Sequence, residues 1–463
     1  MTTPKLTLLA LLATVTAVAQ QAAPRVTAAI DAGRAIGAIR RLHDLDNGPL
    51  CARGIVDLTR FYKELGIRYV RLHDVPYTYD DASDVNYVFP HWDADPDNPA
   101  NYEFRQTDFH LAAISSLGIK VINRLGYSID YRTPVSHATP PPSYERFAAI
   151  CKRIIAHHNE GWANGQHANI EYWEIWNEPD IRVFWTGTPE QFYRLYVETA
   201  KALKQAYPKI KIGGPALAGN LGFLDGMLKY CQEQKAPVDF VSWHIYTRDY
   251  RAVARTAQAV RRTMTHWGYG SAESILDEWN YGPKDWNKLF SDVAATKEYF
   301  DSTQNEVGAA FDAAVLTSLQ DAPVDIATFY SGTTFMWGMF TSSGVPLKPY
   351  YAFLAFRRML DTPKRLSISL DGGMGMTALA GMSDDQKMLR VLIANTSPQA
   401  AKLELQFKDL PWNSRSGYEV HVVDQKSDLT AAGPGTRMER SNPSISLEVG
   451  GSSVYLVTLQ PAP

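Results

Sequence analysis

The feature that most constrains this fold is an alternation of short apolar strands with amphipathic helices, running from about residue 35 to residue 360. Two joints between helix and strand share one form, Leu65-Gly66-Ile67 and Leu117-Gly118-Ile119, and glycine commonly ends a helix. Such alternation predicts a parallel sheet covered by helices. The predicted strands are 35–42, 67–73, 119–125, 170–177, 210–215, 238–244, 273–279 and 324–330. The predicted helices are 53–65, 107–117, 143–159, 188–206, 221–234, 250–267, 304–320 and 349–360.

Eight strand–helix units predict an α/β fold of the closed (β/α)8 type, a TIM barrel, which we assign to residues 20–361. A doubly wound open sheet is the alternative, but no glycine-rich phosphate turn follows the first predicted strand. A glycine-rich string does occur at 372–378. It lies beyond the repeats in a region of β pattern, so we interpret it as a turn.

Beyond the repeats the pattern changes to segments in which apolar and polar residues alternate. These segments are 388–395, 402–407, 418–423, 444–449 and 453–459. They predict an antiparallel β-sandwich domain over residues 362–463, to which 25–30 could add a strand. Such a domain either binds carbohydrate or is structural, and the fold alone does not decide between them.

The N-terminus has the layout of a signal peptide over residues 1–19, with Lys5, an apolar run at 6–18 and a small-x-small site ending at Ala19. It predicts a secreted or periplasmic protein. Later segments are too short to span a membrane. The balance of 46 basic and 49 acidic residues argues against a nucleic-acid partner. Cys51, Cys151 and Cys231 are interpreted as buried free thiols.

Candidate catalytic residues lie where barrel strands end, because barrel enzymes place their chemistry there. The fourth strand ends at Asn177-Glu178, and the seventh carries Glu278. Two carboxylates that face each other across a barrel mouth are what cleavage of a glycosidic bond requires. Trp176, Trp185 and Trp279 are expected beside them, where they would exclude water and meet a sugar.

Neighbouring residues have structural interpretations. Glu174 is expected to be a buried carboxylate inside the barrel, and Asp277 should point to the side of its strand opposite Glu278. Trp173 and Trp243 are expected in the core. His157-His158 falls at a helix C-terminus, where cations are favoured. No C-x-x-C or H-E-x-x-H string indicates zinc.

Four strings together resemble glycoside hydrolase family 39, which includes β-xylosidases and α-L-iduronidases. The string W-N-E-P at 176–179, with a Glu on strand seven, resembles the retaining clan of (β/α)8 glycoside hydrolases. Within that clan, VRLHDV at 70–75, SWHIYT at 242–247 and GVPLKPYYAF at 344–353 are similar to segments of family 39. The resemblance extends over about residues 25–463, since the family also carries a C-terminal β-sandwich.

The resemblance implies a role for each site residue and a double-displacement mechanism without metal or organic cofactor. By it, Glu178 is the general acid/base, Glu278 the nucleophile, and Asn177 the partner of the sugar 2-hydroxyl. The residues implied to line the sugar site are His73, His244, Tyr246 and Trp337, with Tyr246 also orienting Glu278. The resemblance implies a carbohydrate as the partner. Many members of the clan are oligomeric, so it also implies that this protein could form a homo-oligomer.

Several substrates remain open. Exo-action on β-D-xylosides or related pentosides of plant or microbial polysaccharides comes first, because a net charge of −3 suits a neutral sugar better than a sulfated one. An α-L-arabinofuranosidase or other α-L-glycosidase is the second candidate, and an endo-acting polysaccharide hydrolase the third. A non-catalytic carbohydrate-binding protein on a degenerate barrel would be marked by loss of one Glu, and both are present.

Overall fold

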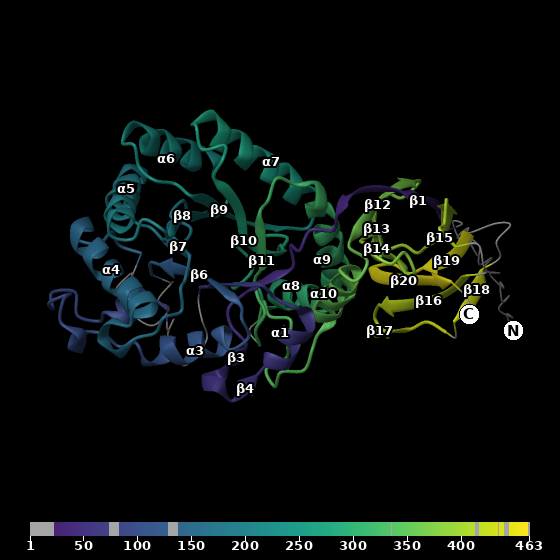
Figure 1. Cartoon of the computed structure of the whole chain (residues 1–463), viewed down its shortest axis with the longest axis horizontal. Coiled ribbons are helices and arrows are strands. Elements are labelled where there is room, and N and C mark those ends of the chain that lie inside the picture. Colours follow the sequence, from purple (N-terminus) through teal and green to yellow (C-terminus); the bar gives the residue numbers. More distant parts are fainter. Residues whose placement is uncertain are drawn as a thin grey trace, which may run out of the picture.

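A computed structural model describes residues 23–73, 83–127, 138–334, 336–412, 416–433, 435–438 and 444–461. Within these ranges, eight parallel strands close into a barrel and ten further strands form one sheet in a second domain (Figure 1). The predicted fold class is confirmed. The predicted signal peptide, residues 1–19, lies outside the described residues.

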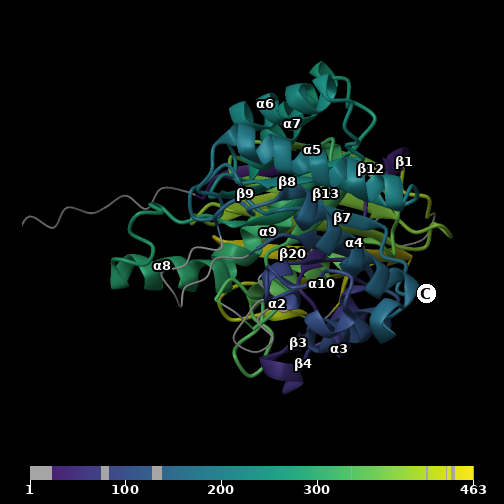
Figure 2. The same cartoon turned by 90° about the vertical axis from the view of Figure 1, so that its left-hand side faces the viewer.

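Each barrel strand pairs in parallel with its neighbours, in the cyclic order β10-β11-β2-β5-β6-β7-β8-β9. The strands are β2 (Asp44–Asp46), β5 (Tyr69–Leu72), β6 (Lys120–Leu125), β7 (Tyr172–Ile175), β8 (Lys211–Leu217), β9 (Phe240–Thr247), β10 (Glu273–Tyr281) and β11 (Ile326–Phe329). The helices are α1 (Thr59–Leu65), α2 (Val85–Val88), α3 (Arg105–Ser115), α4 (Tyr144–Glu160), α5 (Pro189–Ala206), α6 (Leu221–Glu233), α7 (Tyr250–His266), α8 (Val293–Gln304), α9 (Glu306–Ser318) and α10 (Lys348–Met359). Figure 2 shows α8 standing out from the rest of the barrel.

The beginning of the barrel differs from the prediction. The first barrel strand is β2, not 35–42, and residues 35–38 belong instead to β1 (Arg25–Ala38) of the second domain. The predicted helix 53–65 is also too long, because β3 (Leu50–Cys51) and β4 (Val56–Asp57) pair as a short hairpin before α1. Gly66 ends α1 with a φ of 66°, as its position predicts.

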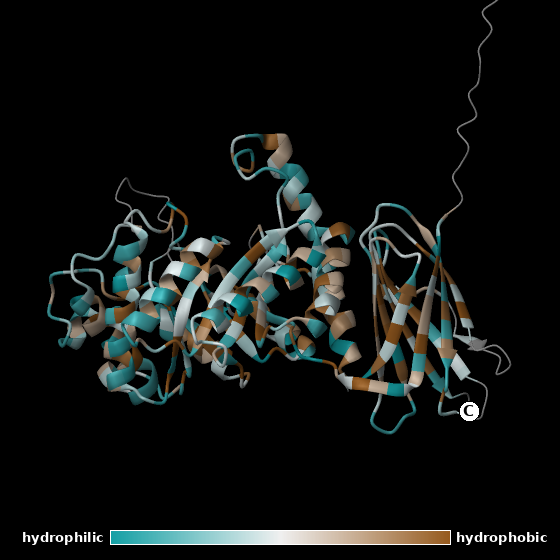
Figure 3. Cartoon of the chain, turned by 90° about the horizontal axis from the view of Figure 1, so that it is seen from above, coloured by the Kyte–Doolittle hydropathy of each residue, from teal (hydrophilic) through white to brown (hydrophobic). Residues whose placement is uncertain are grey.

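The second domain contains β1, β12 (Lys364–Asp371), β13 (Met376–Met382), β14 (Leu389–Asn395), β15 (Ala401–Lys408), β16 (Ser416–Val423), β17 (Asp428–Ala431), β18 (Thr436–Met438), β19 (Ser444–Val449) and β20 (Ser453–Pro461). Most neighbouring strands are antiparallel, as predicted, but β1 runs parallel to β15. Along β1, Val26, Ala28 and Ile30 are buried in the core of this domain. Figure 3 shows apolar and hydrophilic residues alternating along such strands.

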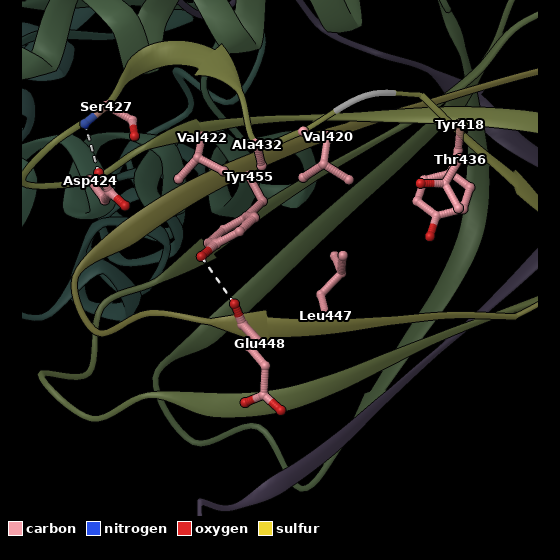
Figure 4. A pocket seen from close by; sticks show the side chains of 11 residues that line it. Tyr418, Val420, Val422, Asp424, Ser427, Ala432, Thr436, Leu447, Glu448 and Tyr455 are labelled. Atoms are coloured by element: carbon pink, nitrogen blue, oxygen red, sulfur yellow. Dashed lines mark hydrogen bonds between the residues drawn. The ribbon is translucent and has the colours of Figure 1, made fainter.

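Opposite parts of this sheet face each other across a cavity of about 460 Å³. Val420 and Val422 of β16 line it from one side and Leu447 of β19 from the other (Figure 4). Tyr455 also lines it, and its hydroxyl donates to the carbonyl of Glu448 (3.2 Å). The strands thus form a sandwich, with room between β16 and β19.

Helices α9 and α10 lie between the barrel and the sandwich (Figure 1). The buried core of the barrel continues into the sheet through Leu392, Val454 and Leu456. Cys51, Cys151 and Cys231 are buried free thiols, as expected. Among the helices described, none has both the length and the apolar character that crossing a membrane requires.

Candidate active site

The predicted site residues come together at the carboxyl ends of four barrel strands. Asn177 and Glu178 directly follow β7, and Glu278 lies on β10. His73 follows β5, and β9 carries His244 and Tyr246. In this arrangement two carboxylates and several polar side chains share one end of the barrel.

Arg71 on β5 joins these groups, although its side chain is completely buried. Its guanidinium donates to Glu278 Oε1 (2.7 Å), Asn177 Oδ1 (2.7 Å) and Glu174 Oε2 (2.8 Å). Asp46 approaches the same guanidinium at 3.4 Å. Charge-assisted bonds from a planar donor fix positions strongly, so Arg71 holds β2, β7 and β10 in register at the site. Glu174 is the buried structural carboxylate that the sequence predicts.

Arg71 also fixes the orientation of the Asn177 amide. Because Asn177 Oδ1 accepts from the guanidinium, its Nδ2 faces away, and this buried NH2 group has no hydrogen-bond partner among the described residues. Buried polar groups are rarely left unpaired in a folded protein. Asn177 is therefore placed to donate to a group that enters the site.

The two carboxylates have different partners. Tyr246 donates its hydroxyl to Glu278 Oε2 (2.8 Å), whereas Glu178 Oε1 lies 2.8 Å from His244 Nδ1. The Glu278 side chain is 6% exposed and that of Glu178 13% exposed. One oxygen of each carboxylate and a ring nitrogen of His244 all lie within 4.8 Å of one another. Retaining glycosidases hold their two carboxyl groups ~5–5.5 Å apart, against ~6.5–9.5 Å in inverting ones.

The backbone that carries Glu178 is strained. Trp176 and Glu178 both have positive φ, 73° and 45°. This backbone conformation is costly for residues other than glycine. The turn is held by hydrogen bonds from Trp176 N to the carbonyl of Leu125 and from Glu178 N to that of Ala216, each 2.9 Å. A Cβ on Gly126 would lie 2.9 Å from the Trp176 Cα, so this close approach requires glycine.

Asp277 does not point away from Glu278, and that prediction is wrong. The pairing of β10 with β9 shifts between Leu276 and Glu278, where two steps on β10 match one step from Trp243 to His244. A bulge of this kind breaks the alternation of side chains. As a result, Asp277 lies 3.2 Å from the Arg71 guanidinium and 3.4 Å from His244 Nε2.

Burial and charge divide the titratable groups of the site. Burial, reinforced by Glu174, raises the pKa of Asp277 well above its usual value, and burial does the same for Asp46. Burial would also raise the pKa of Glu174, but Arg71 lowers it overall. A raised pKa for Asp277 beside a lowered pKa for Glu174 favours a proton on Asp277, which reduces the negative charge that one arginine must balance.

The same effects act on the groups that contact the two candidate catalytic carboxylates. Burial and the Arg71 charge lower the pKa of His244 well below its usual value. Burial and the neighbouring Glu278 raise the pKa of Tyr246 well above its usual value. The imidazole therefore stays neutral and the phenol stays a donor near neutral pH.

Three tryptophans expected beside a sugar belong to the core instead. Trp176 and Trp279 are fully buried and Trp185 is 3% exposed. The Trp176 indole donates to the carbonyl of Phe184, and Trp279 stacks on Phe353. Strand ends in a barrel carry outward-facing residues as well as inward-facing ones, so position along a strand does not determine the side. Trp173 and Trp243 are buried, as predicted.

Exposed aromatic residues lie on the loops beyond β10 and β11. The half-buried Trp337 donates its indole N–H to the Tyr299 hydroxyl (2.9 Å). Trp286, which is 53% exposed, packs edge-on against Tyr246 at 5.6 Å between ring centroids. Since Tyr246 also contacts Glu278, this one tyrosine side chain separates Trp286 from that carboxylate. No local sequence pattern marks Trp286, Arg71 or Asp46 as a site residue.

The match to the family model "Glycosyl hydrolases family 39" covers residues 52–402. The chain belongs to this family. The family resemblance predicted from the sequence is confirmed.

Relatives and solved structures extend this comparison. A β-xylosidase of Geobacillus stearothermophilus is 27% identical over 197 residues, which cover 40% of this chain and 37% of that enzyme. The present chain thus matches little more than a third of the length of that relative. A crystal structure of a glucosidase from Croceicoccus marinus is 24% identical, with a TM-score of 0.77 over 95% of this chain and 99% of the other. A monomeric β-xylosidase from Caulobacter crescentus CB15 gives 0.71 at 16% identity, over 94% and 100%. These structures share the fold of the barrel and the sandwich.

Replacing Arg71 by Met should lower the free energy of unfolding by about 3–5 kcal/mol, because it leaves buried carboxylates without their cation. Urea denaturation at neutral pH measures this loss. Arg194→Met, which removes a solvent-exposed pair with Glu198, is the matched control and should change stability little. Equal stability of the two variants would contradict the central role of Arg71.

Proposed function

We propose that this protein is a retaining glycoside hydrolase that uses Glu278 as nucleophile and Glu178 as acid/base. The observation that carries the proposal is the pair of carboxylates at the ends of β7 and β10, with oxygens within 4.8 Å of each other. This spacing is nearer to the ~5–5.5 Å between the carboxyl groups of retaining enzymes than to the ~6.5–9.5 Å of inverting ones, and it supports direct attack on the anomeric carbon.

The partners of each carboxylate support this division of roles. Glu278 accepts hydrogen bonds from Arg71 and Tyr246, which stabilise a carboxylate and aim it. Glu178 is the more exposed of the two, and its Oε1 lies 2.8 Å from Nδ1 of His244, whose imidazole is neutral. A group that gives a proton to the leaving oxygen and later takes one from water needs such access.

In the first step Glu278 attacks the anomeric carbon while Glu178 protonates the departing oxygen, and a glycosyl ester forms on Glu278. In the second step Glu178 removes a proton from water, which attacks the ester and restores both carboxylates. Asn177 Nδ2 would donate to the 2-hydroxyl, where the hydrogen bond strengthens as positive charge develops on the sugar ring.

We propose a β-D-xyloside as the first substrate, because a β-xylosidase is among the relatives in sequence. His73 and His244 border the sugar beside the nucleophile, with His73 Nε2 at 3.8 Å from Glu278 Oε1. Trp286 and Trp337 lie on the loops beyond, where the departing part of the substrate would pass. We further propose that the protein acts after export, in the periplasm or outside the cell, on fragments of polysaccharides.

A panel of aryl glycosides tests the substrate. We expect the highest kcat/KM on the β-D-xyloside, above the α-L-arabinofuranoside, the α-L-arabinopyranoside and the β-D-glucoside. NMR of the first-formed sugar should show the β-anomer, as retention demands. A first-formed α-anomer from the β-xyloside would refute the double displacement.

Replacing Glu278 by Ala should reduce turnover of the preferred substrate by about 10⁴-fold or more, since no covalent intermediate can form. Azide should restore part of the activity and yield the α-glycosyl azide, because the small anion attacks directly from the vacated side. Glu190→Ala, an exposed carboxylate in the first turn of α5, is the control and should behave like the wild type. Near wild-type turnover by Glu278→Ala would exclude it as the nucleophile.

Replacing Glu178 by Ala should lower kcat/KM by about 10²–10⁴-fold on substrates with poor leaving groups, which depend on proton donation. Aryl glycosides with acidic phenols need little protonation, so their first step should be nearly unaffected. A plot of rate against leaving-group pKa should therefore be steeper for the variant than for the wild type. Equal slopes would remove Glu178 from the acid/base role.

A further inference from the structure

A second cluster of ionisable side chains lies on the outside of the barrel, between α3 and α4. Asp108 is in the first turn of α3, and His157 and His158 are in the last turn of α4. One donor atom from each of the three lies within 4.8 Å of the other two. We propose that these side chains bind a divalent transition-metal ion of the zinc type.

The hydrogen bonds of His157 fix its tautomer. Its Nδ1 lies 2.8 Å from the backbone carbonyl of Trp162, which can only accept, so Nδ1 carries the proton. Its Nε2 faces the Asp108 carboxylate, at 2.9 Å from Oδ1 and 3.1 Å from Oδ2. In the neutral ring this nitrogen would direct a lone pair at an anion. A cation must therefore lie between them, either a second proton or a metal ion.

His158 argues for the metal ion. The side chain is fully buried, and within the part of the chain that the structure describes neither ring nitrogen has a hydrogen-bond partner. Its Nδ1 lies 3.8 Å from Asp108 Oδ1. This distance is too long for a hydrogen bond, but it allows both atoms to bind the same metal ion. A proton between His157 and Asp108 would leave His158 Nδ1 without a partner, whereas a metal ion would bind this nitrogen as well as His157 Nε2.

The distances suit the small tetrahedral shell of zinc. Bonds of ~2.0–2.1 Å place neighbouring tetrahedral ligands about 3.3 Å apart. The distances from Asp108 Oδ1 to His157 Nε2 (2.9 Å) and to His158 Nδ1 (3.8 Å) lie on either side of this value. The Asp108 side chain is 29% exposed, which leaves a direction open for water as the fourth ligand.

The surroundings hold the ligands as metal sites usually do. The Trp162 carbonyl orients His157, and Gln166 Nε2 donates to Asp108 Oδ1 (3.2 Å) and to its backbone carbonyl (3.0 Å). Phe104 stacks on the His157 ring at 3.5 Å and fixes its plane. Both histidines lie at the negative end of the α4 dipole, which favours a bound cation.

Metal titration of the full chain tests the proposal. After dialysis against EDTA and removal of the chelator, Zn²⁺ should bind with a stoichiometry of one in isothermal titration calorimetry. Co²⁺ in its place should give the intense visible absorption of a tetrahedral site. Asp108→Asn and His158→Leu should each abolish the cobalt spectrum and weaken zinc binding by at least about tenfold, the lower bound for loss of a ligand-shell group.

His266→Ala is the matched control, because His266 is an exposed histidine at the C-terminus of another helix, α7. This variant should bind like the wild type. The proposal fails if the wild type shows no tetrahedral cobalt spectrum, or if zinc binding persists unchanged in Asp108→Asn and His158→Leu. The wild-type spectrum decides the matter even where a variant does not fold. Either failure would leave the contact between His157 and Asp108 as a hydrogen bond without a metal, and would not affect the proposed hydrolase activity.

Discussion

The buried guanidinium of Arg71 is the interaction on which the barrel mouth depends. Removing a charge from water costs several kcal/mol, and only close partners offset that cost. Arg71 finds them on β2, β7 and β10, at distances between 2.7 and 3.4 Å. Because one rigid plane of donors contacts Glu278 and Asn177 together, the candidate nucleophile and the candidate sugar-binding amide have a fixed relation to each other. The stability of the barrel and the geometry of the site thus rest on the same side chain.

Around this cation the carboxyl groups are made different by their surroundings. Burial raises the pKa of Asp277 and of Asp46 well above the usual value, whereas the contact with Arg71 lowers the pKa of Glu174. Four carboxyl groups can therefore share one arginine without mutual repulsion between all of them. Chemically identical groups acquire separate duties through position alone, which is how a carboxylate pair can serve as acid and nucleophile.

The repeated strand–helix pattern was sufficient to predict the barrel, because eight amphipathic units have few ways to bury their apolar faces. Strand ends were sufficient to locate Glu178 and Glu278 at one edge. The side on which a residue lies was harder. Asp277 escaped the simple alternation because a bulge in β10 is a property of the pairing with β9 and has no signature in the local sequence. Trp176 and Trp279 were misplaced because an indole at a strand end can face the helices as readily as the mouth.

The first strand was missed for a related reason. Residues 35–38 are apolar enough for a barrel strand, yet β1 alternates buried and exposed positions over its first half, which suits a sheet with one covered face. The true first barrel strand, β2, has only three residues, and its two Asp residues form ion pairs with Arg68 and Arg71. A local sequence pattern does not reveal partners that lie so far away along the chain.

The place of β1 has a consequence for how the molecule can be divided. The first strand, β1, belongs to the sandwich. The whole barrel follows in the sequence, and β12–β20 then complete the sandwich, in which β1 lies between β12 and β15. The barrel is one continuous segment of the chain, whereas the sandwich is assembled from two segments that lie on either side of it in the sequence. A cut near residue 361 would leave the C-terminal fragment with a gap in the middle of its sheet, and the N-terminal fragment with a long strand that has lost both neighbours. During synthesis, β12 and β15 can pair with β1 only after the ribosome has made the entire barrel segment.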